Sequence, residues 1–486
     1  MAILPTSLLS LASASLILTS TVHASSATIF LAPEQDIVLP SSDSASNPLE
    51  WLGANSPYFT GPKVHGVSNQ VPDKCFVEQV AYNVRHGSRF PDSGAYSGWV
   101  TLYQKIQASN FTAKGSLSFL TSWEPVLTNP TLQIAQESPT GYKEAYDLGY
   151  QLRTRYPDLY AYGQPFISWA NLYPRVVQTA QNFVRGFLGS TASTLGTVIT
   201  INSTGSEQAL FDSLGPSDLC PAFVDGNGGT QATTWNNIYL PPILKRLEKL
   251  IDGNLNLTTS DISSVPYLCG FESQITGTLS PWCSVFTDKE LAQYEYAQDL
   301  RYYYGIGPGV DLPSKMMLPY LNALVGILDQ GPGVNGTFAN GSTYTLPRIL
   351  TAFMNDGQIT ELGAATGVWD DTTVLSGTEI PDKYKYIASH FVSMRGTVAF
   401  ERLNCNDKLY IRILLNDVVY PLPACKDGPG DSCLLSRYVA LIKSKVTAAG
   451  NLVERCNVTA ANAPTKVKGA SFYTDLSSPW LASVTP

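Results

Sequence analysis

The sequence contains few of the residues from which metal sites and nucleic-acid-binding surfaces are built. It has four histidines in 486 residues, and charged residues make up 14% of the chain. None of its eight cysteines stands in a Cys-x-x-Cys pair, the usual spacing of a structural zinc site. The formal net charge is −8, whereas a nucleic-acid-binding domain is normally basic. We therefore expect no metal ion, no cofactor and no nucleic-acid partner.

Two common catalytic motifs and a membrane span are also missing. The chain has neither a Gly-x-Ser-x-Gly serine elbow nor a Walker loop for nucleotide phosphates. Beyond residue 24, no apolar run reaches the length of a membrane-spanning helix. Hydrophobic residues still make up 44% of the chain, enough for a large core. These features predict a globular protein without a membrane partner.

Residues 1–24 have the pattern of a secretory signal peptide. They contain no Asp, Glu, Lys or Arg, and positions 8–18 are apolar. Val22-His23-Ala24 resembles the small-x-small site at which such peptides are cleaved. An uncleaved membrane anchor is the alternative. We expect a secreted protein, either extracellular or in the cell wall.

The cysteines and several asparagines suit a secreted chain. The even number of cysteines favours disulfides, and Cys269–Cys283 and Cys425–Cys433 are close enough for local loops. For the other four we favour Cys75–Cys405 and Cys220–Cys456, although spacing does not settle that choice. Six asparagines stand in Asn-x-Ser/Thr sequons and are expected glycosylation sites: Asn110, Asn202, Asn256, Asn335, Asn340 and Asn457.

The stretch Arg85-His86-Gly87-Ser88-Arg89-Phe90-Pro91 is the strongest sign of chemistry. It directly follows a predicted strand, residues 76–84. Two guanidinium groups beside an imidazole repel one another unless an anion binds between them. Arginine forks fit phosphoryl oxygens, and a neutral histidine between them can act as a nucleophile. We favour a phosphate site over the alternative, a strand end with solvated arginines.

Two further predicted strands, 166–169 and 349–354, also precede candidate site residues. Arg175 follows Pro174 in the first turn of a predicted helix, where backbone amides and the helix dipole attract anions. Asp356, after the other strand, can protonate a leaving alkoxide. Taken alone, Arg175 would be a surface residue and Asp356 a helix cap. Ligands of α/β sheets bind at the carboxyl ends of strands, so the three segments predict one pocket.

The same patterns predict an α/β fold with a mainly helical insertion. Residues 25–74 are expected to form an extended arm that wraps the body or a neighbouring subunit in a homo-oligomer. Helices are expected over 138–155, 240–251 and 287–304, and strands over 397–403 and 409–420. We assign the α/β core to residues 75–100, 161–205 and 345–475, the helical insertion to 101–160 and 206–344, and a tail to 476–486.

Together these segments resemble the secreted fungal histidine acid phosphatases, the branch of the histidine phosphatase superfamily that includes yeast-type repressible acid phosphatases and fungal phytases. Arg85 to Pro91 matches the family signature, and Arg175-Val176-Val177-Gln178-Thr179-Ala180 resembles its second arginine segment. Other similar segments are Phe286-Thr287-Asp288-Lys289-Glu290, Gln298-Asp299-Leu300-Arg301-Tyr302-Tyr303-Tyr304, Glu401-Arg402-Leu403-Asn404-Cys405 and 413–421. The resemblance extends from about residue 50 to 475.

The resemblance implies a fold and a mechanism. The fold is an α/β core with a central mixed, mainly parallel sheet flanked by helices, plus an inserted helical domain. By resemblance, His86 attacks phosphorus to form a phosphohistidine, and Asp356 protonates the leaving group without a metal ion. The phosphoryl oxygens are bound by Arg85, Arg89 and Arg175.

One position departs from the family pattern, which has His-Asp where this chain has Asn355-Asp356. Asn355 is a neutral donor of similar reach and is expected to bind a phosphate oxygen. Loss of one charge-assisted hydrogen bond costs roughly 1.5–3 kcal/mol, so we expect weaker or pH-shifted activity. A degenerate, non-catalytic phosphate-binding glycoprotein is the alternative.

Two acidic residues and the other histidines complete the candidates. Glu295 and Asp299 share one helix face, and family members use acidic groups of this domain in substrate handling; solvated helix charges are the alternative. His65 and His390 match no family catalytic position, so we expect them to be packed or hydrogen-bonded.

The leading hypothesis is a secreted acid phosphatase acting on phosphomonoesters. A phytase is the second, but Lys and Arg are scarce outside the motif, which favours broad specificity. A phosphoglycerate-mutase-like transferase shares the histidine chemistry, yet a secreted protein has little access to that substrate.

Overall fold

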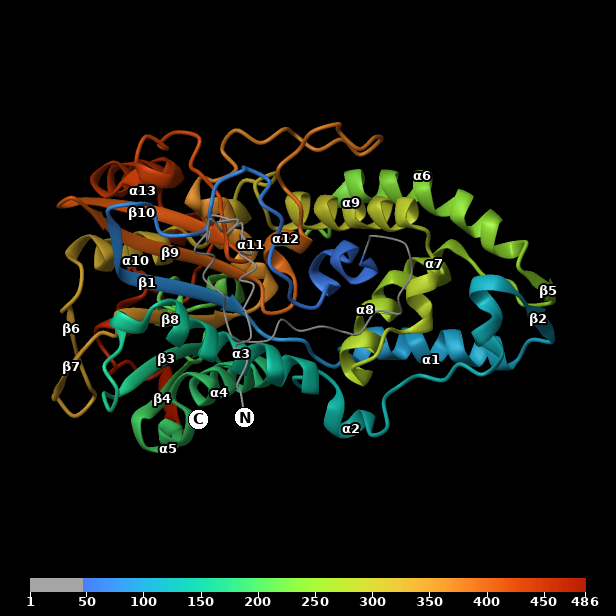
Figure 1. Cartoon of the computed structure of the whole chain (residues 1–486), viewed down its shortest axis with the longest axis horizontal. Coiled ribbons are helices and arrows are strands. Elements are labelled where there is room, and N and C mark those ends of the chain that lie inside the picture. Colours follow the sequence, from blue (N-terminus) through green and yellow to red (C-terminus); the bar gives the residue numbers. More distant parts are fainter. Residues whose placement is uncertain (1–46) are drawn as a thin grey trace, which may run out of the picture.

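The computed structural model describes residues 47–486. The predicted signal peptide and residues 25–46 of the predicted arm lie outside the described residues. Within the described chain, a sheet with helices on both faces forms one side of the molecule, and a mainly helical region projects from it (Figure 1). This confirms the predicted class, an α/β fold with a mixed sheet and inserted helices.

The helices and the strands of residues 47–486 are each numbered in chain order. The α-helices are α1 (Ser93–Gln107), α2 (Pro130–Gln133), α3 (Pro139–Arg155), α4 (Pro174–Leu188), α5 (Ala192–Leu195), α6 (Gly229–Glu248), α7 (Thr259–Ser263), α8 (Val265–Thr276), α9 (Asp288–Gly305), α10 (Leu318–Gln330), α11 (Asp356–Thr366), α12 (Ser389–Val392), α13 (Leu435–Ala449) and α14 (Leu452–Arg455). The strands are β1 (Cys75–Arg85), β2 (Phe111–Ala113), β3 (Phe166–Asn171), β4 (Gly196–Ile201), β5 (Ile251–Gly253), β6 (Asn335–Thr337), β7 (Thr343–Thr345), β8 (Ile349–Met354), β9 (Thr397–Cys405), β10 (Lys408–Leu415), β11 (Val418–Val419), β12 (Cys433–Leu434) and β13 (Leu481–Val484).

The main sheet of the described chain has a parallel centre and antiparallel edges. Its strand order is β11-β10-β9-β1-β8-β3-β4-β13, with β12 paired to β10. Strands β1, β8, β3 and β4 are mutually parallel, whereas β9 is antiparallel to β1 and β13 is antiparallel to β4. The carboxyl ends of β1, β8 and β3 therefore lie at one edge, where the three predicted site segments begin.

Strand β1 is buried because it lies between two apolar layers. Val80, Tyr82 and Val84 belong to the layer that α3 and α4 cover. Ala81 belongs to the opposite layer, which includes residues of α10, α11 and α13. A central parallel strand that is covered on both faces reads as a nearly continuous apolar run, which made this strand easy to predict.

The structure places two helices of the expected insertion against the sheet instead. Helix α3 packs on α4, and α10 packs on α13. Leu148 and Leu152 of α3 lie in the same apolar layer as β1. The region that projects away from the sheet contains α1, α6, α7, α8 and α9 (Figure 1).

Helix α6 begins earlier than predicted because it continues through two prolines. It starts at Gly229 and includes Pro241 and Pro242, although proline normally interrupts a helix. Trp235 and Ile243, on either side of the prolines, are both buried, and α6 packs along α9. Tertiary packing therefore outweighs the local signal. Helix α9 agrees with its prediction.

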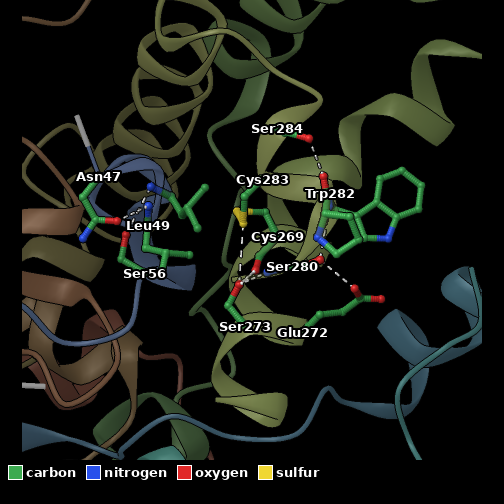
Figure 2. The surroundings of a disulfide bond; sticks show 12 residues. Asn47, Leu49, Ser56, Cys269, Glu272, Ser273, Ser280, Trp282, Cys283 and Ser284 are labelled. Atoms are coloured by element: carbon green, nitrogen blue, oxygen red, sulfur yellow. Dashed lines mark hydrogen bonds between the residues drawn. A yellow bond between two sulfur atoms is a disulfide. The ribbon is translucent and has the colours of Figure 1, made fainter. Parts of the chain in front are cut away.

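A disulfide and a set of buried hydrogen bonds join α8 to the turn before α9 (Figure 2). Ser273 Oγ donates to the carbonyl of Cys269 at 2.6 Å and accepts from the Ser280 amide at 2.9 Å. Glu272 accepts from Ser280 Oγ at 2.7 Å. All four predicted disulfides are confirmed: Cys75–Cys405, Cys220–Cys456, Cys269–Cys283 and Cys425–Cys433.

Residues 47–56 of the expected arm pack on their own chain. They form two short 3-10 turns, Pro48–Trp51 and Gly53–Asn55, instead of an extended segment. Leu49 and Leu52 are buried in the core that includes the helical region. This part of the arm belongs to the body, and an oligomer formed through the arm stays a prediction.

The C-terminal region differs from expectation in two places. The expected strand 409–420 is divided by a turn at Asn416 and Asp417, whose φ angles of 41° and 63° are left-handed. Asparagine and aspartate tolerate this conformation in tight hairpin turns. The expected tail contains β13, which pairs with the sheet edge at β4.

The predicted glycosylation sites lie at the surface. Asn202 is partly exposed, and the other five asparagines are exposed. Their glycosylation stays a prediction.

Candidate active site

His86 is the first residue after β1 and is buried at the carboxyl edge of the sheet. Its amide donates to the carbonyl of Met354, the last residue of β8, at 3.0 Å. Nδ1 lies 2.9 Å from the carbonyl of Gly87, so in the neutral ring Nδ1 carries the hydrogen and donates it. No hydrogen bond to Nε2 is made by any residue between 47 and 486. The lone pair of Nε2 is therefore available.

Burial and the charges around His86 keep its ring neutral. Burial, followed by the charges of Arg175 and Arg85, lowers the pKa of His86 well below its usual range. A neutral imidazole at acidic pH is the form that can attack an electrophile.

Three arginines surround His86, each from a different position. Arg85 ends β1, Arg89 lies in the loop after it, and Arg175 stands in the first turn of α4, which follows β3. Each has a buried Nε–H group with no hydrogen-bond partner in the described chain. Burial, followed by the charge of Arg89, lowers the pKa of Arg175 to about 10. Unpaired donors with mutual repulsion form a site for an oxyanion.

Buried side chains hold the loop that carries these residues. The Gly87 amide donates to Thr179 Oγ1 of α4 at 2.9 Å. The Ser88 amide and hydroxyl both donate to Glu144 of α3, at 2.7 and 2.9 Å. A Cβ atom on Gly87 would lie 2.9 Å from the carbonyl oxygen of Gly141 in α3, so the close approach of that helix backbone requires glycine here.

Asp356 begins helix α11 directly after β8 and reaches the same site. Its Oδ2 accepts from the Tyr302 hydroxyl at 2.6 Å and lies 3.9 Å from Nη2 of Arg85. Its side chain is 32% exposed, so a ligand can reach it. Burial by itself raises the pKa of Asp356, but Arg85 and the Tyr302 hydroxyl outweigh burial and hold that pKa well below its usual range.

Asn355, the residue that departs from the family pattern, contacts Arg175. Nη2 of Arg175 donates to Asn355 Oδ1 at 3.0 Å. The Nδ2 donor group of this amide has no partner among residues 47–486. Asn355 therefore orients an arginine with its oxygen while keeping a donor for a ligand.

Glu295 and Asp299 do not face the pocket, so their predicted role is wrong. Glu295 accepts from the amides of Gly53 and Ser389, at 2.7 and 2.9 Å. Asp299 accepts from the Ala388 amide at 2.6 Å and from the Tyr384 hydroxyl at 2.8 Å. Both carboxyl groups are buried, and they attach the 3-10 turn at Gly53 and the start of α12 to helix α9.

The other two described histidines are packed, as expected. The ring of His65 lies 4.9 Å from that of Tyr420, and the ring of His390 lies 6.3 Å from that of Phe59. Burial lowers the pKa of His390 to about 4. Among residues 47–486 there is no cluster of three His, Cys, Asp or Glu side chains suited to a metal ion.

Three contacts at the site have no local sequence signal. The Arg395 amide donates to the carbonyl of His86 at 2.8 Å, and Arg395 has a left-handed φ of 55°, which is rare for this residue type. Nη1 of Arg85 donates to the carbonyl of Ala54, in the N-terminal segment. Tyr302 lies in a segment that resembles the family, but nothing in the sequence pairs it with Asp356.

Comparisons with known proteins agree with this geometry. Residues 77–416 match the model of the histidine phosphatase superfamily (branch 2). A thiamine-repressible acid phosphatase of Schizosaccharomyces pombe is 32% identical over 440 residues, which cover 84% of this chain and 90% of that protein. A phytase of Candida albicans is 28% identical over 434 residues, which cover 87% of this chain and 90% of that protein.

A solved structure gives the same result at the level of the fold. The crystal structure of the phytase from D. castellii superposes with a TM-score of 0.78 at 26% identity. The match covers 92% of this chain and 94% of that chain. The family match includes His86, the three arginines and Asp356. The chain belongs to branch 2 of the histidine phosphatase superfamily.

Proposed function

We propose that this protein is a secreted acid phosphatase that hydrolyses phosphomonoesters through a phosphohistidine on His86, without a metal ion. One observation carries the proposal: a buried, neutral imidazole beside three guanidinium groups whose Nε donors have no partner in the described chain. A tetrahedral oxyanion supplies the missing acceptors and the missing negative charge. Similarity to acid phosphatases and phytases supports the same chemistry.

In the first step, the Nε2 lone pair of His86 attacks phosphorus and the bond from phosphorus to the ester oxygen breaks. Arg85, Arg89 and Arg175 bind the non-bridging oxygens, where charge develops in the transition state. Asp356 transfers its proton to the departing oxygen, so the alcohol leaves as a neutral molecule.

In the second step, water attacks the phosphohistidine and the bond between nitrogen and phosphorus breaks. Asp356, now a carboxylate, takes a proton from the water, and His86 returns to its neutral form. Inorganic phosphate then leaves the arginines. The cycle regenerates both His86 and the protonated acid.

An acidic optimum follows from the state of Asp356. In the free site, Arg85 and Tyr302 hold the pKa of this acid low. A bound phosphoryl group adds negative charge beside Asp356 and engages Arg85, and both changes raise its pKa. Acidic solution then keeps the proton in place for the leaving group. Asn355 donates from Nδ2 to a phosphoryl oxygen and keeps Arg175 in position.

A phytase is the second candidate, favoured by the similarity to two phytases. A substrate with many phosphate groups needs cations beyond those that bind the reacting one. Arg301, which neighbours Asp356, is already paired with Asp225 at 2.7 Å. We therefore rank simple phosphomonoesters first as substrates. The relative rates of hydrolysis of glycerol phosphate and inositol hexakisphosphate decide between an acid phosphatase and a phytase.

Three features support a location outside the cell. The chain has four disulfides, and its sequons lie at the surface. In the described part of the chain, no helix is both long enough and apolar enough to cross a membrane. The N-terminal sequence has the signal-peptide pattern.

Phosphate release from p-nitrophenyl phosphate between pH 3 and 7, with a chelator present, tests the proposal. We expect turnover in the presence of chelator and a loss on the order of 10⁴-fold or more in His86→Ala. His65→Gln, which replaces a packed histidine, is the control and should keep full activity.

Thermal unfolding with inorganic phosphate separates loss of catalysis from loss of the site. Phosphate at 100 times its dissociation constant should stabilise wild type and His86→Ala alike by roughly 2.7 kcal/mol, because the arginines remain. Binding without turnover in wild type would identify a degenerate, phosphate-binding protein. Neither binding nor turnover by folded protein would reject the proposed function.

A further inference from the structure

The acid of the active site is held by a hydroxyl from the helical region. Asp356 belongs to α11 beside the sheet, whereas Tyr302 lies on α9 in the projecting region. The Tyr302 hydroxyl donates to Asp356 Oδ2 at 2.6 Å, and the tyrosine is 5% exposed. Burial, followed by the charge of Asp356, raises the pKa of Tyr302, so this hydroxyl stays protonated and acts as a donor.

Neighbouring groups fix the position of Tyr302. The guanidinium carbon of Arg301 lies 4.8 Å from the centroid of the Tyr302 ring. Arg301 is itself held by two hydrogen bonds to Asp225, at 3.0 and 2.7 Å. Stacking and ion pairing together leave the ring little freedom, so its hydroxyl points at Asp356 before substrate arrives.

This contact makes the two oxygens of Asp356 different. Oδ2 accepts from Tyr302 and lies 3.9 Å from Arg85. Oδ1 has no hydrogen-bond partner among the described residues. An oxygen that already accepts a strong hydrogen bond is the poorer place for the acid proton, so once bound substrate has raised the pKa of Asp356, its proton resides on Oδ1.

We propose that Tyr302 is a positioning residue for protonation of the leaving group: its hydroxyl binds Oδ2 of Asp356 and thereby presents the proton on Oδ1 to the ester oxygen. This rests on the proposed function. As the bond between phosphorus and oxygen breaks, the proton moves from Oδ1 to the leaving oxygen. The carboxylate that remains is stabilised by the hydrogen bond from Tyr302 and by Arg85.

The leaving group provides the first test, in Tyr302→Phe, which keeps the ring and removes the hydroxyl. We expect kcat/KM for glycerol phosphate to fall about 10- to 100-fold, the effect of losing a hydrogen bond to a charged group. For 2,4-dinitrophenyl phosphate, whose leaving group needs no proton, we expect a change below about threefold. An equal loss on both substrates would overturn the proposal, because a merely structural role does not distinguish leaving groups.

Two further variants sharpen that comparison. Tyr304→Phe removes a hydroxyl of the same helix that donates to the Leu375 carbonyl, and it should leave the ratio of the two substrates unchanged. In an Asp356→Ala background, Tyr302→Phe should have no additional effect on either substrate, because the hydroxyl acts through that carboxyl group. An additional loss there would contradict the proposal.

The second test needs no turnover. Ionised Asp356 repels phosphate, so phosphate affinity measured by calorimetry between pH 2.5 and 6 reports its ionisation. In Tyr302→Phe, the pH at which affinity falls should move upward relative to wild type and Tyr304→Phe, because the carboxylate has lost a donor. Apart from Tyr302 itself, the charged or titratable groups that face Asp356 are the same in all three proteins: Arg85, His86, Arg175 and Arg301.

The two tests also separate this inference from the proposed function. An unmoved affinity profile would overturn the role of Tyr302 even in an active enzyme. If wild type hydrolysed neither ester, the proposed function would fail, while the affinity profile would still decide whether Tyr302 controls Asp356.

Discussion

Two groups of buried arginines in this protein have opposite surroundings. At the active site, Arg85, Arg89 and Arg175 each keep an Nε donor without a partner in the described chain. On the hairpin of β9 and β10, Arg412 pairs with Glu401, and its Nε donates to the same carboxylate at 2.6 Å.

The second group consists of Arg412 and Arg155, whose charges are neutralised by buried carboxylates of the same chain. Arg155 of α3 lies 3.2 Å from Glu401 and 3.7 Å from Asp417. Burial by itself raises the pKa of Glu401, but Arg412 and Arg155 outweigh burial and lower it. The contrast is one of pairing: Arg412 and Arg155 lie against buried carboxylates of the fold, whereas among residues 47–486 the active-site arginines have only the more distant Asp356 and Asp92, at 3.9 and 3.7 Å, and are proposed to bind the substrate anion.

Removing one charge from each group should produce opposite results, and this is the largest expected effect. Arg175→Gln should lower kcat/KM roughly 10²- to 10³-fold, because a donor to the transition-state oxyanion is lost. Its stability should hold or rise, because like charges repel Arg175 in the empty site. Glu401→Gln should lower the free energy of unfolding by roughly 3–5 kcal/mol, because it leaves buried arginines unpaired. Initial rates and urea unfolding measure the two quantities.

An exposed ion pair provides the control for both variants. Arg437 and Asp427 pair at 2.8 Å with side chains 51% and 64% exposed. Arg437→Gln should change stability by less than about 1 kcal/mol and leave activity intact. Equal destabilisation by Arg175→Gln and Glu401→Gln would remove the distinction between the two groups.

The dependence of stability on pH extends the comparison to carboxyl groups. Burial raises the pKa of Glu137 to about 8, and burial also raises the pKa of Glu272 and of Glu295 to about 7. These groups hold their protons more tightly in the folded state, so their stabilisation is full below the unfolded value of 4.5 and is lost progressively as pH rises from there to 7 and 8. Glu401, with a lowered pKa, contributes in the opposite sense, above its unfolded value of 4.5.

We therefore expect the melting temperature to fall between pH 6.5 and about 8 and to level off above that pH. The buried histidines stay neutral in this window, because burial lowers their pKa values. Glu137→Gln should flatten the decrease, whereas Glu124→Gln, at an exposed position, should leave it unchanged. A melting temperature that rises across the window would contradict this explanation.

The smallest expected effect comes from restoring the family residue in Asn355→His. Below pH 6 an imidazolium can give phosphate a charge-assisted bond, worth roughly 1.5–3 kcal/mol, in place of the neutral bond from Asn355, worth roughly 0.5–1.5 kcal/mol, so the net gain is about 1 kcal/mol. Phosphate affinity should increase there, and the phosphate-free protein should melt slightly lower, because Arg175 loses an acceptor and gains a like charge. Calorimetry and thermal unfolding test this; abolished activity would instead show that the Asn355 oxygen is essential for holding Arg175.

Many helices and strands could be predicted because the signals that specify them lie close together in the sequence. The apolar run before Arg85 predicts β1, and Ser138 caps α3 at the start of the predicted helix 138–155. Thr287 and Glu290 form a capping box at the start of α9. These signals act within one turn or one strand, so they appear in the sequence without knowledge of the fold.

Apart from the missed turn at Asn416 and Asp417, the failures involve partners that are distant in the chain. Glu295 and Asp299 share a helix face as predicted, but loops at residues 53 and 384–389 occupy their carboxyl groups. Packing on α9 carries α6 through two prolines, and β13 pairs with β4 although more than half of the chain separates them. Local patterns do not contain this information.

The sequence by itself determined the candidates for the chemistry: a histidine between arginines after one strand, an arginine after a second and an acid after a third. Parallel strands end at a common edge, so that much follows from chain order. Only the tertiary structure decided which charged side chains stay unpaired. It also decided which carboxyl oxygen of Asp356 accepts the hydrogen bond from Tyr302. The physical reason is that these contacts join elements whose distance and orientation depend on packing of the whole core.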